Sequence, residues 1–103
     1  MSFSAFSPAA TTKSLTATTA TSNVALSGTG NAVRVYNQGS VDAYVNFGAA
    51  SVTASIPSGG SSSLPIAAGE IEVFALDYNN QTYVAGITVS GTAALFFTVG
   101  DGL

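Results

Sequence analysis

The C-terminal segment 83–103, YVAGITVSGTAALFFTVGDGL, constrains the fold of this chain more than any other stretch. In residues 93–99, Leu95, Phe97 and Val99 share one face of an extended strand, while Phe96 lies on the other face. A strand that is apolar on both faces is either central in a sandwich or lies at an interface. Residues 83–89 also have the composition of a strand, and the Ser-Gly-Thr between the two is a tight-turn signal. The segment therefore predicts a β-hairpin, which the upstream strands must cover because one hairpin is marginally stable in water.

Short strand-like segments separated by Gly, Asn, Ser and Pro recur along the rest of the chain, and none has a helical period. Including the C-terminal pair, about eight strands are expected, at residues 14–18, 23–27, 32–37, 43–47, 52–54, 70–77, 83–89 and 93–99. The first has no large apolar side chains beyond Leu15, so we expect an edge strand with Leu15 and Ala17 inward. The pattern predicts an all-β, antiparallel β-sandwich that is jelly-roll-like.

Two tyrosines occupy outward positions of neighbouring strands in the middle of the chain. Residues 32–37 and 43–47 alternate cleanly on either side of a Gln-Gly-Ser turn, which predicts a second hairpin. Tyr36 and Tyr44 then lie near each other on its outer face. Such a pair can be mere packing, but tyrosine is enriched at protein contacts, so both are interface candidates.

The N-terminal segment carries two aromatic side chains, Phe3 and Phe6, without a clear period. Two interpretations stay open: a loose chain end, or an arm whose phenylalanines dock into a neighbouring subunit. We treat residues 1–103 as one domain in which residues 1–12 form an extended, flexible N-terminal arm. Phe3 and Phe6 join the interface candidates.

Charge is scarce in this chain, since 7% of its residues are charged against about 25% in ordinary globular domains. A nearly neutral, hydroxyl-rich surface favours association, so we expect a homo-oligomer or docking on a larger body. The net charge of −3 argues against nucleic acid and anionic membranes as partners. Residues 1–20 lack the basic and apolar regions of a secretory signal, and no stretch approaches a membrane span.

The chain contains no histidine and no cysteine, which rules out triads, thiol nucleophiles and zinc sites that depend on them. Glu70 and Glu72 stand two apart on one strand, where a solvated edge explains them better than a glycosidase pair. The turn at residues 77–80 offers oxygen ligands but lacks the spacing of a calcium loop. Asp101 fits a solvated tail residue or a polar contact to a neighbour. We therefore expect no enzyme, no catalytic residue, no cofactor and no metal.

Three segments carry a resemblance to known proteins: NAVRVYNQGSVDAYVNFG at residues 31–48, LPIAAGE at residues 64–70, and the ending at residues 83–103. Together they resemble small all-β virion structural proteins of tailed bacteriophages. In those proteins a Val-Arg-Val-x-Asn strand leads through a glycine turn into an aromatic strand. A Pro-x-x-Ala-Gly step follows, and the chain ends near Gly-acidic-Gly-Leu. The resemblance covers about the last 70 residues and includes no motif that defines a catalytic family.

The resemblance implies a capsid decoration or cement protein that binds capsomer junctions and stabilises the phage head. The implied partner is the major capsid protein. We also expect the protein to self-associate around a symmetry axis, as a homotrimer, and to lie across capsid subunits. The implied location is the capsid surface of a virion assembled in the host bacterial cytoplasm. The alternative is a carbohydrate- or receptor-binding β-sandwich module associated with a tail or fibre. Phe3, Phe6, Tyr36 and Tyr44 are the anchors expected in the capsid interpretation.

Overall fold

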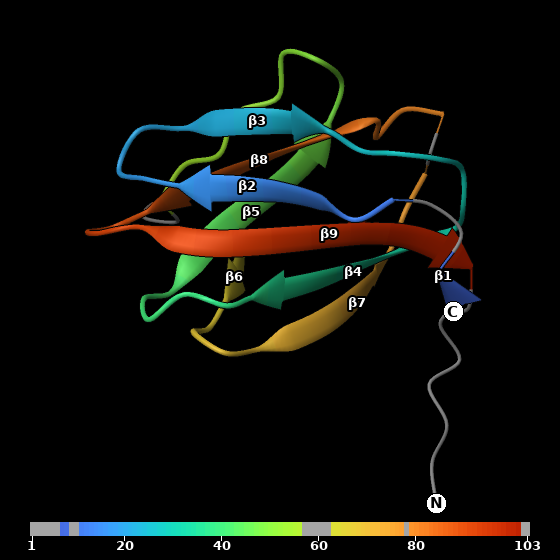
Figure 1. The fold of residues 1–103 in the computed structure, drawn as a ribbon. Helices are drawn as coiled ribbons and strands as arrows, with labels where there is room; N and C mark the ends of the chain where they lie inside the picture. Colours follow the sequence, from blue (N-terminus) through green and yellow to red (C-terminus); the bar gives the residue numbers. More distant parts are fainter. Residues whose placement is uncertain (1–6, 9–10, 57–62, 78, 102–103) are drawn as a thin grey trace, which may run out of the picture.

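The structure is a computed structural model that describes residues 7–8, 11–56, 63–77 and 79–101. Two antiparallel sheets pack face to face (Figure 1). Sheet A has the order β2-β9-β4-β7, formed by Lys13–Ala17, Ala93–Asp101, Ala32–Asn37 and Ile71–Ala75. Sheet B has the order β3-β8-β5-β6, formed by Ser22–Ala25, Tyr83–Thr88, Ala43–Gly48 and Leu64–Ile66. The two-residue β1, Ser7–Pro8, pairs with the end of β9 beyond β2.

The order of the strands is that of a jelly roll, with eight strands in two four-stranded sheets when β1 is left aside. From β2 onward every link crosses from one sheet to the other, except the link from β5 to β6, which stays in sheet B. The predicted fold class is confirmed. The first predicted strand is also an edge, since β2 pairs only with β9 among the described strands.

Both predicted hairpins are wrong, because their strands lie in opposite sheets. β9 pairs with β2 and β4, whereas β8 pairs with β3 and β5. The link between β8 and β9 is an arch over the core, in which the Thr88 hydroxyl donates to the Gly91 carbonyl at 2.8 Å and Gly91 has φ of 71°. β4 and β5 are likewise in different sheets. Strands in opposite sheets bury their inward apolar faces against each other across the core. The two strands of a flat hairpin lie in one sheet and cannot cover each other in this way.

The core lies between the sheets and is filled mostly by the central strands. Leu95, Phe97 and Val99 of β9 are almost completely buried, as are Val33 and Val35 of β4. Sheet B completes the core with side chains from three strands: Val45, Ile66 and Val84. β9 is therefore a central strand, as its two apolar faces predict, and Phe96 points away from the core.

The segment at residues 49–54 forms no strand, contrary to the expectation for residues 52–54. It covers part of the outer face of sheet B. The side-chain amide of Asn23 donates to the carbonyls of Ala50 and Val52, and that of Asn46 donates to the carbonyl of Thr53. Both asparagines flank Ala85 in the sheet, and Ala85 is completely buried although it points outward. Part of this sheet is thus sealed by the chain itself.

Candidate functional site on the outer face of sheet A

The outer face of sheet A carries an aromatic row across its central strands. Phe96 of β9 pairs with Ser14 on one side and with Tyr36 of β4 on the other, and Tyr36 pairs with Ile71 of β7. The Phe96 and Tyr36 rings are stacked, with centroids 6.2 Å apart and planes inclined by 27°. Ile71 at the end of the row is 48% exposed. A contiguous strip of apolar surface therefore runs across β9, β4 and β7.

A second row, polar in character, runs beside the first. Thr98 of β9 pairs with Arg34 of β4, and Arg34 pairs with Val73 of β7. On the far side, the Thr12 and Thr98 hydroxyls are 2.7 Å apart and share a hydrogen bond. We call the two rows together the sheet-A face, and its members are Thr12, Ser14, Arg34, Tyr36, Ile71, Val73, Phe96 and Thr98.

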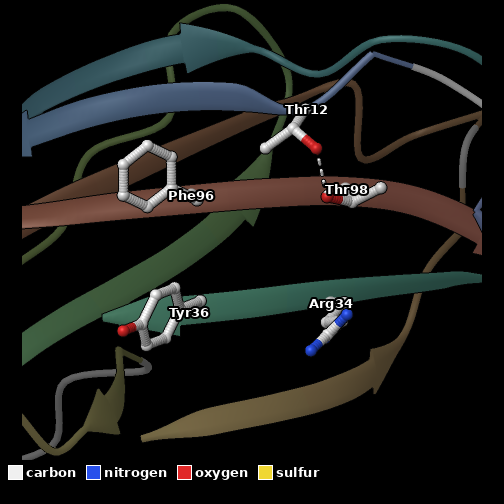
Figure 2. Close-up of a pocket in the computed structure, with 5 residues that line it drawn as sticks. All are labelled: Thr12, Arg34, Tyr36, Phe96 and Thr98. Atoms are coloured by element: carbon white, nitrogen blue, oxygen red, sulfur yellow. Dashed lines mark hydrogen bonds between the residues drawn. The ribbon is translucent and has the colours of Figure 1, made fainter. Parts of the chain in front are cut away.

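Five of these residues line an open pocket of about 190 Å³. Figure 2 shows the Phe96 and Tyr36 rings side by side, with Arg34 and the Thr12–Thr98 pair further along the strands. Pockets that hold drug-sized molecules are commonly about 300–1,000 Å³. The smaller volume suits a single side chain or a single sugar ring.

Arg34 supplies the only formal charge on the sheet-A face. Its side chain is exposed, and no carboxylate of a described residue lies within ion-pairing distance of it. It is the only arginine of the chain, and Lys13 is the only other basic side chain. An arginine beside two aromatic rings is a combination enriched at the centres of protein contacts.

The two outer faces of the sandwich differ. Residues 49–54 cover the middle of sheet B, whereas no described segment crosses the middle of sheet A, where the Phe96 and Tyr36 side chains stay partly exposed. The sheet-A face is accordingly the better candidate for contact with another molecule.

The structure separates the two tyrosines that were expected to lie together. Tyr36 belongs to the sheet-A face, but Tyr44 lies on the outer face of sheet B, paired with Ile87 and Pro65. The expected neighbourhood is wrong because β4 and β5 are in opposite sheets. Phe3 and Phe6 lie outside the described residues. From the predicted N-terminal arm, Ser7–Pro8 pairs with Gly100 and Asp101, and Thr12 contacts Thr98.

Sequence reasoning missed Arg34, Phe96 and Ile71 as site residues. The outward position of Phe96 follows from the alternation in β9, so part of the signal was present in the sequence. The remaining part was the pairing of β9 with β4 and of β4 with β7, which brings three strands distant in the chain side by side.

Most of the acidic side chains accept hydrogen bonds from amide groups in turns. Glu70 accepts a hydrogen bond from the Ala67 amide through Oε1 at 2.9 Å, so it closes a turn and is more than a solvated edge residue. Asp77 accepts from the Asn79 amide and from Asn80 Nδ2, as a hydrogen-bonded turn requires. Asp101 accepts from the Asn31 amide.

Within the described ranges, no three histidine, cysteine or acidic residues come close enough together to hold a metal ion. No helix in that part of the chain has the length and apolar character needed to cross a membrane. The fold and the site define an all-β jelly-roll domain with an exposed aromatic and arginine-bearing sheet face. Comparisons with protein-family models, with curated proteins and with solved structures found no match to this chain.

Proposed function

We propose that this chain is a structural virion protein that decorates a phage head, binding at capsomer junctions and stabilising the shell. The observation that carries the proposal is the sheet-A face. Its two aromatic rings and Arg34 stand on the central strands β4 and β9, where the core and neighbouring strands hold the backbone in place. Aromatic and arginine side chains in a well-supported patch supply most of the binding energy in protein contacts.

The resemblance to small all-β phage proteins points the same way and supplies the partner, the major capsid protein. Its Val-Arg-Val-x-Asn motif corresponds to β4, in which Val33, Val35 and Asn37 are buried and Arg34 is exposed. The motif therefore combines residues that form the core with one that is available for contact. Many copies on a symmetric shell would multiply individually weak contacts.

The experiment is binding of the purified chain to heads of the encoding phage that lack it. We expect saturable co-sedimentation with heads and a higher temperature of head disruption once the chain is bound. Phe96→Ala should weaken binding, and Thr53→Ala, on the covered side of the sandwich, should leave it unchanged. Failure of the wild-type chain to bind heads contradicts the capsid placement.

The second candidate is a carbohydrate- or receptor-binding module associated with a tail or fibre. One observation favours it: the pocket combines two aromatic rings, two threonine hydroxyls and a guanidinium, which together can stack on and hydrogen-bond a sugar ring. A glycan array distinguishes the candidates. Glycan binding that Phe96→Ala abolishes, without binding to heads, favours this second function.

A further inference from the structure

Two of the five acidic side chains lie together at one end of the sandwich. Asp42, in the turn from β4 to β5, accepts a hydrogen bond from the Ala68 amide at 3.0 Å through Oδ1. Glu70, in the turn from β6 to β7, accepts from the Ala67 amide through Oε1. Within the described residues, the second oxygen of each carboxylate makes no hydrogen bond. Each carboxylate is thus oriented by one hydrogen bond, and its second oxygen can accept a hydrogen bond from another molecule.

Apolar side chains accompany these carboxylates. Val89, in the arch from β8 to β9, is 63% exposed, and Val41 is partly buried beside Asp42. A Cβ built on Gly91 would lie 3.6 Å from Val41, so the β8–β9 arch adjoins the β4–β5 turn. We call Val41, Asp42, Glu70 and Val89 the acidic end. It offers two negative charges next to exposed apolar surface.

We propose that the acidic end of one copy of this chain binds the sheet-A face of a second copy. The two surfaces are complementary in charge and in apolar character. Arg34 of one copy forms an ion pair with the carboxylate of Asp42 or Glu70 of the other, and the exposed Val89 packs on the Phe96–Tyr36–Ile71 strip. The pocket volume of about 190 Å³ matches one inserted side chain. This inference rests on the proposed function together with the self-association expected from the sequence.

Contact between two sheet-A faces fits the charges less well. No acidic side chain is a member of the sheet-A face, so a symmetric face-to-face dimer brings no carboxylate from the opposing face to Arg34. The opposite end of the sandwich is also a poorer partner. Both oxygens of Asp77 are occupied within its own turn, so Asp101 is the one described carboxylate there with an oxygen that makes no hydrogen bond to a described residue. Contact between a face and an end is heterologous, and such a contact forms a ring when its rotation closes.

Sedimentation equilibrium of the isolated chain tests the inference with three variants. Arg34→Glu reverses the charge on the sheet-A face. The double variant Asp42→Asn, Glu70→Gln removes both charges from the acidic end and keeps an acceptor oxygen for each turn. Lys13→Glu is the control, since it makes the same charge change on sheet A outside the sheet-A face. We expect the first two to weaken association about tenfold or more, and Lys13→Glu to change it less than twofold.

A mixing experiment guards against an effect of misfolding. Arg34→Glu chains mixed with Asp42→Asn, Glu70→Gln chains should associate better than either alone, since the intact acidic end of the first variant meets the intact sheet-A face of the second. Four results would overturn the inference. The wild-type chain could be monomeric, or the Arg34→Glu chain could associate as strongly as the wild type. Lys13→Glu could weaken association as much as Arg34→Glu does, or mixing could restore no association. The sheet-A face also carries the proposed contact with the shell, so in any one copy it binds either a second copy or the shell. Binding to heads is therefore measured with the Asp42→Asn, Glu70→Gln variant, which keeps the sheet-A face intact and separates failure of the capsid placement from failure of this contact.

Discussion

The side-chain amide of Asn37 donates a hydrogen bond to the backbone carbonyl of Ile66 at 3.0 Å, and this bond joins β4 of sheet A to β6 of sheet B. The same amide group donates to the Val41 carbonyl, and Asn37 Oδ1 accepts from the Gly39 amide. Asn37 is completely buried. One side chain therefore shapes the turn after β4 and holds the two sheets together at that end.

Replacing Asn37 by alanine should destabilise the fold strongly. The change leaves the buried Ile66 carbonyl without this donor and removes two bonds that shape the turn. We expect a loss of about 2–4 kcal/mol in the free energy of unfolding, since an unsatisfied buried polar group costs about 1–3 kcal/mol. Urea unfolding measures it. Asn79→Ala is the exposed control, and a loss no larger than that of the control would refute the role assigned to Asn37.

The two adjacent phenylalanines of β9 should respond differently to truncation. Phe97→Ala empties a core position and should cost about 3–5 kcal/mol. Phe96→Ala removes a partly exposed ring from the sheet-A face, so we expect a smaller cost, together with weaker self-association. Chemical denaturation and sedimentation on both variants check this. Equal destabilisation by the two changes would contradict the assigned faces.

Gly30 should not tolerate a side chain. A Cβ at this position would lie 2.2 Å from the Gly100 carbonyl oxygen, so the link before β4 or the end of β9 would have to move. We expect Gly30→Ala to cost about 1–3 kcal/mol, as overpacking usually does. The neighbouring Thr29 is exposed, and Thr29→Ala should cost less than about 0.5 kcal/mol. Thermal unfolding of both variants provides the measurement, and similar melting temperatures would count against this packing.

Asn23 and Asn46 should hold residues 49–54 against sheet B. In a double alanine variant, hydrogen exchange at the amides of Val52 and Ala54 should accelerate, because the cover loses three side-chain bonds. The amide of Phe97 on the central β9 serves as an internal control and should keep its protection. Unchanged exchange at Val52 and Ala54 would show that other contacts hold the cover.

Alternation in the sequence predicted most of the strands and the direction of their side chains. Val33 and Val35 point inward, Arg34 points outward, and β9 is central, all as expected from a period of two. These features are local, since they depend only on neighbouring residues within one strand. The jelly-roll class followed from the number of strands and the absence of a helical period.

The pairing of strands could not be derived in this way. A turn such as Ser90-Gly91-Thr92 shows that the chain reverses, but a reversal within one sheet and an arch between two sheets use the same residue types. The choice between them depends on which strands pair with β8 and β9, and those strands come from segments 13–17, 22–25, 32–37 and 43–48. The sheet-A face depended on the same long-range pairing, so only Tyr36 among its aromatic residues was a candidate from the sequence.

The central claim, that this chain is a shell-binding assembly protein, is tested most directly by a cryo-EM map of heads to which the purified chain has been added. We predict repeated density for the β-sandwich on the outer surface at capsomer junctions, with Arg34, Tyr36 and Phe96 at a protein contact. A map with no added density, or with the sheet-A face turned toward solvent in every copy, would contradict the claim.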